Sequence, residues 1–247
     1  MLGLGNAVTT HLTPVIFDNQ YALSFDGTND FIEVDDAAGE IDTDKGTIAM
    51  WVKLDAMSSS GHIIKATSGN DNNYINIFWH NGNAEIRFVY RADSTTKRVD
   101  SDQASLENDG NWHHIAMTWV KTGATAGTLI GYVDGSAVSE GATTGLTAFD
   151  AATSVMDIGR NAHSGAAYFA GDIDEVAIFN ATLSASNVSE LYNSGVVKDP
   201  RGTASASKLI AYWRFEEGSG NDALELVAGN TGTISGATYI TTVKTDD

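Results

Sequence analysis

Apolar and polar residues alternate along most of the chain. The alternation is clearest in residues 85–91, where charged and apolar side chains fall on opposite faces of an extended strand. Turn signals such as Asn81-Gly82, Asp109-Gly110 and Asp134-Gly135 separate such runs, and the last predicts a type I′ hairpin. Other strand-like runs cover residues 47–54, 74–79, 112–120 and 129–133. This spacing predicts an all-β fold, an antiparallel two-sheet jelly-roll sandwich, rather than alternating βα units.

A helical pattern occurs in residues 183–195. Ser184 is placed to cap the start of the helix, and Gly195 to end it. Val188, Leu191 and Tyr192 fall on one side of the helix. We therefore expect one short helix that packs on the sandwich.

The chain divides into three parts. Residues 1–20 read as an extended N-terminal arm, and residues 21–196 carry the regular strand pattern. Residues 197–247 begin as a linker and return to strand-like sequence. This last part is too short for a core of its own, so its strands are expected to pack on the same sandwich.

Composition excludes several classes of partner and site. The net charge is −18, with 32 acidic and 14 basic residues, so nucleic acid is not expected as a direct partner. Cysteine is absent, which excludes disulfides and thiolate metal sites. No apolar run approaches the roughly 18 residues that a membrane span requires. The N-terminus shows no signal-peptide pattern.

Two segments far apart in the sequence join a strand pattern to a cluster of Asp and Asn. The first contains Asp26, Asn29 and Asp30, and the second contains Asp172 and Asp174. If the two strands are neighbours in one sheet, these side chains supply the oxygen ligands that calcium prefers. We therefore predict calcium as a cofactor; the alternative is that these residues only shape turns and cap backbone amides.

A second group of polar and aromatic residues surrounds the Asn81-Gly82 turn. Such residues line sugar-binding grooves, where rings stack and polar groups bind hydroxyls. The candidate ligand-binding residues are Tyr74, Asn76, Trp79, His80, Asn81, Arg87 and Arg91. The alternative, which we favour, is that Tyr74 and Trp79 are core aromatics and that the arginines lie on a solvated face.

Six phrases, in order, resemble the laminin G-like, concanavalin A-like lectin and glucanase jelly-roll family, particularly its bacterial and phage branch. The resemblance covers about residues 21–196. Its phrases are Leu23-Ser-Phe-Asp-Gly-Thr-Asn-Asp30, Thr47-Ile-Ala-Met-Trp-Val52, Asp109-Gly-Asn-Trp-His-His-Ile-Ala116, Gly131-Tyr-Val-Asp-Gly135, Gly171-Asp-Ile-Asp-Glu-Val176 and Leu183-Ser-Ala-Ser-Asn-Val-Ser-Glu-Leu-Tyr192. The resemblance implies the fold, whereas function depends on sites that vary within a fold.

Glycosidases of this architecture place two carboxylates about 5–5.5 Å apart on one strand. Glu33-Val-Asp35 lacks the second Glu of that pattern, and Asp172-Ile-Asp174-Glu175 is expected to put Glu175 on the opposite face. His113-His114 reads as a packed pair within a strand rather than as a catalytic base. We therefore expect no enzyme.

The combined interpretation is a non-catalytic binding or structural module, stabilised by calcium. We expect it on a larger assembly such as a phage virion, as a decoration or appendage protein, or on a cell surface. The arm would bind other protein subunits of that assembly, and surface glycans are possible ligands. The alternatives are a soluble calcium-dependent carbohydrate-binding lectin domain and, third, a glycoside hydrolase.

Overall fold

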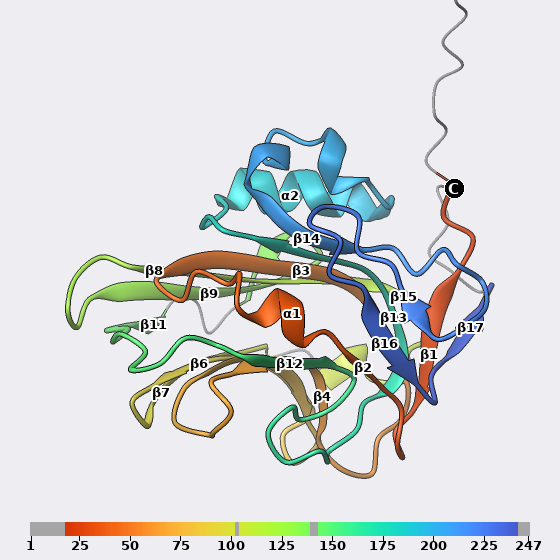
Figure 1. Ribbon diagram of the computed structural model, residues 1–247, viewed down its shortest axis with the longest axis horizontal. Coiled ribbons are helices and arrows are strands. Elements are labelled where there is room, and N and C mark those ends of the chain that lie inside the picture. The colour runs from red at the N-terminus through yellow and green to blue at the C-terminus, as the bar shows by residue number, and fades with distance from the viewer. Residues whose placement is uncertain (1–17, 102–103, 139–142, 242–247) are drawn as a thin grey trace, which may run out of the picture.

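Two antiparallel sheets packed face to face form the protein, as the strand pattern predicts. The computed structural model describes residues 18–101, 104–138 and 143–241. Figure 1 shows the two layers edge-on, with the helix α2 above the upper sheet. We call the upper layer sheet A and the lower one sheet B.

Within residues 18–101, 104–138 and 143–241, sheet A holds nine strands and sheet B eight. The order in sheet A is β10 (Ser136–Ala137), β9 (Gly127–Val133), β8 (His113–Lys121), β3 (Lys45–Leu54), β13 (Ala170–Phe179), β1 (Ala22–Asp26) and β17 (Thr238–Ile240), with β11 (Thr143–Thr144) beside β9 and β14 (Leu209–Trp213) beside β13. The order in sheet B is β15 (Asp222–Ala223), β16 (Gly232–Ser235), β2 (Phe31–Glu33), β12 (Val155–Ile158), β4 (Gly61–Thr67), β5 (Tyr74–His80), β6 (Glu85–Ala92) and β7 (Thr95–Asp100).

The core lies between the sheets and is made by the inward residues of each alternating strand. Its largest fully buried side chains include Trp79 and Phe88 from sheet B and Trp119 and Trp213 from sheet A. Strand β8 lies between β3 and β9, which confirms the central position expected from its apolar sequence. Burial of this apolar surface is the main stabilising term of the fold.

The two acidic segments that lie far apart in the sequence are neighbours in sheet A. Strands β1 and β13 pair in antiparallel register, with Ser24 opposite Asp172 and Asp26 opposite Ala170. The spatial adjacency on which the calcium prediction rested is therefore present.

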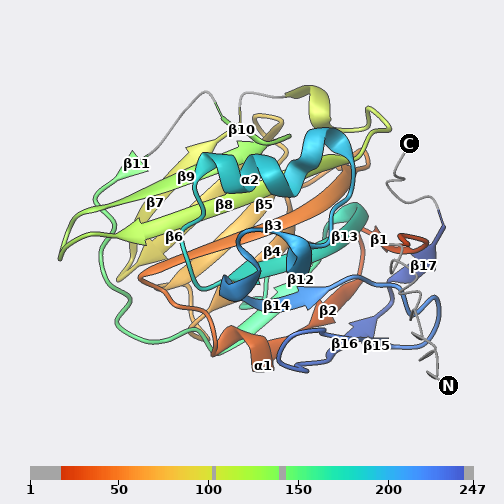
Figure 2. The ribbon, with the colours of Figure 1, turned by 90° about the horizontal axis from the view of Figure 1, so that it is seen from above.

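Helix α2 (Ala185–Tyr192) begins as predicted. The Ser184 side chain accepts a hydrogen bond from the Asn187 amide, and Val188 and Leu191 are buried against sheet A. Figure 2, seen from above, shows α2 crossing the strands of that sheet. The helix ends earlier than predicted, at Asn193 rather than Gly195, because Asn193 already adopts the left-handed conformation with φ of 49°.

A further helical turn, α1 (Asp35–Ala38), lies next to β12 and is not visible in the sequence pattern. The predicted type I′ hairpin is confirmed: Asp134 and Gly135 have φ values of 48° and 73° and join β9 to β10. Within the described residues, no helix has the length and apolar character needed to cross a bilayer.

The C-terminal segment contributes strands to both sheets. Strand β14 pairs with β13, β16 pairs with β2, and β17 pairs with β1. The preceding residues are more ordered than the linker we expected. They form two short 3₁₀ turns, Pro200–Gly202 and Ala206–Lys208, and bury Pro200, Thr203 and Ser205.

Most of the expected N-terminal arm, residues 1–17, lies outside the described residues. The first described residues are held by the segment that follows β14. Arg214 donates a hydrogen bond to the Asp18 carbonyl at 2.6 Å, and the Gln20 amide donates to Glu216 at 3.1 Å.

Candidate functional site

The two outer faces of the sandwich differ. Helix α2 lies on the outer face of sheet A, whereas the outer face of sheet B points away from it (Figure 1). Loops between β4 and β5 and between β12 and β13 flank this second face. The outer face of sheet B is therefore the candidate surface for ligand binding.

The alternation of β5 and β6 supplies this face with rings and charges. Tyr74, Phe78 and His80 are half-buried on the outward side of β5. Asn76 lies on the same side but is only 2% exposed, and Ile75, Ile77 and Trp79 are buried in the core. Strand β6 adds Arg87 and Arg91, which lie opposite Phe78 and Tyr74.

A bulge in β4 adds two further side chains. The register shifts between His62 and Ile64, so that Ile63 and Ile64 both enter the core. His62 and Lys65 then both face outward although they are three positions apart.

Phe78 is the centre of one cluster on the face. Its ring stacks on His62 at 5.1 Å with an interplanar angle of 16°, and the Arg87 guanidinium lies over it at 5.9 Å. His62 Nδ1 hydrogen-bonds to Asn76 Oδ1 at 2.9 Å. Burial lowers the pKa of His62 to about 4, so the ring is neutral at pH 7. The cluster combines a half-buried aromatic ring with polar groups.

Tyr74 is the centre of a second cluster. Lys65 Nζ lies 4.4 Å from the centre of its ring, and the Arg91 guanidinium lies at 5.8 Å. Lys65 Nζ also donates to Asp71 Oδ1 at 2.6 Å and to Asn161 Oδ1 at 3.0 Å. Both flanking loops thus meet β4 and β5 at this cluster.

The face continues across β12 to β2. The Arg160 guanidinium lies 3.3 Å from the centre of the Phe31 ring, and its Nε donates to Asp157 Oδ2 at 2.5 Å. Asp157 lies opposite Lys65 in the sheet. A band of aromatic and charged side chains therefore crosses sheet B.

The structure brings together five of the seven candidate ligand-binding residues: Tyr74, Asn76, His80, Arg87 and Arg91. Trp79 must be corrected: its side chain is 0% exposed and belongs to the core, because it lies one residue out of phase with its outward neighbours. Tyr74, which we expected in the core, is only half-buried and faces outward. Asn81 lies in the turn beyond β5, where its Nδ2 donates to the Ser58 carbonyl at 2.9 Å.

Sequence reasoning missed several residues of this face. Phe78 alternates with Tyr74, Asn76 and His80, so the two-residue period alone would have found it. The period could not find Lys65 and His62, because the β4 bulge breaks it. Asp71 and Arg160 belong to loops and reach the face only through the fold.

The first acidic segment forms a turn at one end of the sandwich. Asp26 Oδ1 accepts hydrogen bonds from the Thr28 and Asn29 amides at 2.7 and 3.4 Å, and Asp30 Oδ2 accepts from the Asp26 amide at 2.9 Å. Asp26 also lines a cleft of about 190 Å³ together with Ser58, Ser59 and Tyr168. These carboxylates cap backbone amides, as the alternative to calcium binding supposed.

The second acidic segment has other partners. Asp172 pairs with Lys53 at 3.2 Å, and Asp174 Oδ2 accepts from Asn19 Nδ2 at 2.9 Å. In the part of the chain that the structure describes, no three His, Asp or Glu side chains converge as metal ligands. The five residues proposed for calcium therefore do not fit one shared site, and calcium binding at a subset of them stays a prediction.

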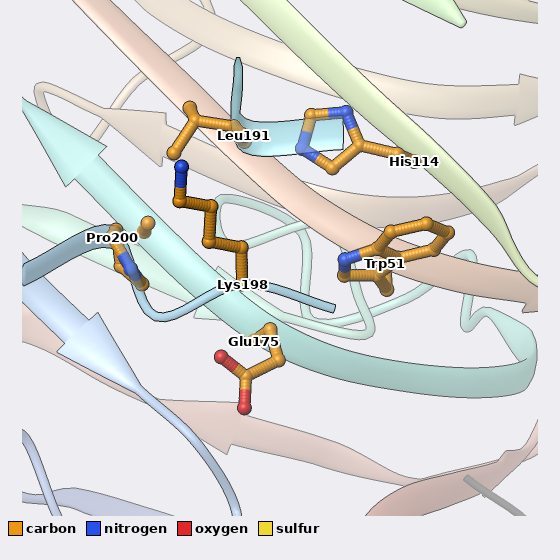
Figure 3. A pocket seen from close by; sticks show the side chains of 8 residues that line it. Trp51, His114, Glu175, Leu191, Lys198 and Pro200 are labelled. Atoms are coloured by element: carbon orange, nitrogen blue, oxygen red, sulfur yellow. The ribbon is translucent and has the colours of Figure 1, made fainter. Parts of the chain in front are cut away.

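Glu175 is displaced by a bulge. We expected it on the face opposite Asp174, but its φ of 55° and the register shift after Asp174 bring it to the same outer side of sheet A. There it lines a cavity of about 10 Å³ beneath α2 with Trp51, His114 and Lys198 (Figure 3). The Tyr212 hydroxyl and Arg214 Nε hydrogen-bond to its carboxyl group.

This cavity has room for about one water molecule and none for a sugar. Burial raises the pKa of Glu175 to about 8 and that of Asp174 well above its ordinary range. His114 is also buried, and burial lowers its pKa to about 4. The described residues of this cavity therefore enclose a space too small for a sugar.

The chain matches the family model of the concanavalin A-like lectin/glucanases superfamily over residues 26–189. It belongs to this superfamily. The resemblance read from the sequence phrases is thereby confirmed. No match was found among curated proteins.

Solved structures of low sequence identity share the fold. A Bacteroides ovatus protein assigned to carbohydrate binding has a TM-score of 0.61 at 17% identity, over 90% of this chain and 60% of its own. The chain thus spans about 60% of that protein's length. The CBM40 module of a Ruminococcus gnavus IT-sialidase, bound to α2,3-sialyllactose, has a TM-score of 0.54 at 15% identity, over 69% and 96% of the two chains. The NanB sialidase of Streptococcus pneumoniae has a TM-score of 0.53 at 18% identity, over 68% of this chain and 27% of its own.

Proposed function

We propose that this protein is a non-catalytic module that binds carbohydrate on the outer face of sheet B. The observation that carries the proposal is the band of outward side chains on β4, β5 and β6. Two half-buried rings, Tyr74 and Phe78, lie among amide, imidazole and guanidinium groups, as sugar binding requires. Membership of a lectin and glucanase superfamily supports the same interpretation.

The cavity around Glu175 supports a binding role rather than hydrolysis. Asp174 and Glu175 are adjacent acids on one side of a strand, which is the feature a glycosidase would need. Both are buried, Glu175 beside a cavity of about 10 Å³ and Asp174 against Asn19, and this burial argues against a position on either side of a glycosidic bond. Sialidases appear among the structural neighbours, but the match covers 27% of the NanB chain.

The experiment is a glycan array followed by titration calorimetry on each hit. Tyr74→Ala and Phe78→Ala are each expected to weaken binding by about tenfold or more, since each removes an aromatic contact. Tyr239→Ala is the matched control, because Tyr239 lies in β17 of the other sheet.

Tyr168→Ala tests the competing position at the 190 Å³ cleft near Asp26. If this variant loses binding while Tyr74→Ala and Phe78→Ala retain it, the site is the cleft and our assignment is wrong. An array without hits, with and without calcium, would refute the binding function itself.

Display on a phage virion or a cell surface stays a prediction. It rested on the acidic composition without cysteine and on the N-terminal arm, most of which lies outside the described residues. Calcium dependence likewise stays a prediction and has its own test below.

A further inference from the structure

One cation on the proposed binding face differs from its neighbours. Arg91 lies on β6 directly opposite Tyr74. Its Nη1 donates to Thr96 Oγ1 at 3.4 Å, which is a long contact with an uncharged group. Its Nε is buried and has no hydrogen-bond partner among the described residues.

The other cations of this face each have a carboxylate partner. Lys65 pairs with Asp71 at 2.6 Å, Arg87 with Glu85 at 2.7 Å, Arg98 with Asp100 at 2.8 Å and Arg160 with Asp157 at 2.5 Å. For Arg91 the described part of the chain supplies no carboxylate within ion-pair distance; the Asp71 carboxylate, which pairs with Lys65, acts on Arg91 only from farther away. The protein has more than twice as many acidic as basic residues, so a shortage of carboxylates does not explain why Arg91 has no ion-pair partner.

The surroundings of Arg91 favour an anion. The Arg91 side chain is half-buried and has no ion-pair partner among the described residues, so an anion that reaches its terminal nitrogens would stabilise it. The Lys65 side chain is 3% exposed and lies over the same Tyr74 ring, so two cations flank that ring. The charge of −18 on the whole molecule repels anions, but salt screens distant charges over about 8 Å at physiological ionic strength. The nearest charges therefore decide what binds at Tyr74.

We propose that the face binds a carbohydrate that carries a negative charge, a carboxylate or a sulfate, and that Arg91 receives this charge. The proposal rests on the carbohydrate-binding function given above. The two terminal nitrogens of the guanidinium form a fork that holds a carboxylate or sulfate through two hydrogen bonds, while the buried Nε stays inside the protein. The sugar ring then lies against Tyr74, with Asp71 and His163 of the flanking loops near its hydroxyls; His163 Nε2 and Asp71 Oδ2 are 3.9 Å apart.

The test compares glycans that share one core and differ only in charge. An array carries each core in uncharged, carboxylated and sulfated form, and hits are titrated with wild type, Arg91→Gln, Arg91→Lys and Lys208→Gln. Lys208→Gln is the matched control: it removes one charge from an exposed residue in a 3₁₀ turn remote from sheet B. The carboxylated and sulfated arms show which anion Arg91 takes.

We expect wild type to bind a charged form at least about tenfold more tightly than its uncharged counterpart, and Arg91→Gln to abolish this preference. Arg91→Lys is expected to restore only part of it, because a lysine is a point charge without the fork. Lys208→Gln should behave as wild type.

Two results separate this proposal from the proposed function. If wild type binds uncharged glycans as well as charged ones, or if Arg91→Gln and Lys208→Gln behave alike, the charge assignment is overturned while carbohydrate binding stands. If no glycan of any charge binds to wild type, both are overturned.

Discussion

The protonation state of Glu175 tests whether this carboxyl group, which with Asp174 most resembles a glycosidase pair, is a buried structural group. Its carboxyl group is buried beneath α2, and burial raises its pKa to about 8, above the roughly 4.3 of an unfolded chain. Between these values the folded protein keeps a proton that the unfolded chain has lost. The free energy of unfolding therefore falls as pH rises from the pKa of the unfolded chain to that of the folded protein. Outside this pH range, Glu175 adds no pH dependence to the free energy of unfolding.

The expected size follows from proton linkage. One such proton changes the free energy of unfolding by about 1.4 kcal/mol per pH unit. Between pH 5 and 7, wild type should thus lose about 3 kcal/mol more than Glu175→Gln. Glutamine has nearly the same shape and keeps an oxygen acceptor for Tyr212 and Arg214, so the fold should persist.

Urea unfolding followed by tryptophan fluorescence at a series of pH values measures this difference. Glu40→Gln is the control, because Glu40 is an exposed glutamate far from the cavity. Equal pH slopes in wild type and Glu175→Gln would refute the reasoning, since they would mean that Glu175 is ionised in the folded protein.

Three further predictions concern the core, the acidic turn and calcium. Trp79→Ala should lower the free energy of unfolding by about 3–5 kcal/mol, because it leaves a cavity in the core, whereas Tyr74→Ala should cost about 1 kcal/mol; similar losses in urea titrations would contradict this assignment of faces. Gly236→Ala should cost about 1–3 kcal/mol more than Gly110→Ala, since both have positive φ but only at Gly236 would a Cβ collide with another atom, Asp30 Oδ1; equal losses would argue against this contact. If calcium binds beside Asp26, a chelator should lower the melting midpoint of wild type but not that of Asp26→Asn, and an unchanged wild-type midpoint would exclude calcium stabilisation.

The strand alternation carried most of the fold information. It predicted the polar outer face of β6, the central position of β8 and the hairpin at Asp134, because each depends on the residues of one short segment. Strand pairing over long separations does not follow from local alternation, and it could only be supposed from two distant acidic segments of similar pattern. The pairing of β1 with β13 is such a case.

The binding face was predictable only in part. The two-residue period finds Tyr74, Asn76, Phe78 and His80 on one side of β5, and it also shows that Trp79 belongs to the other side. The bulges in β4 and β13 interrupt that period, so the sequence could not place Lys65 or Glu175. Whether Arg91 forms an ion pair depends on which carboxylates the fold brings near it. The sequence alone therefore could not predict it.

The most direct test of the account is an amide chemical-shift map of the protein titrated with a glycan that it binds. The account predicts that the shifted amides cluster on β4, β5 and β6 and in the two flanking loops. Shifts confined to residues 26–30, 58–59 and 168–170, or spread over sheet A, would show that the outer face of sheet B is not the binding site.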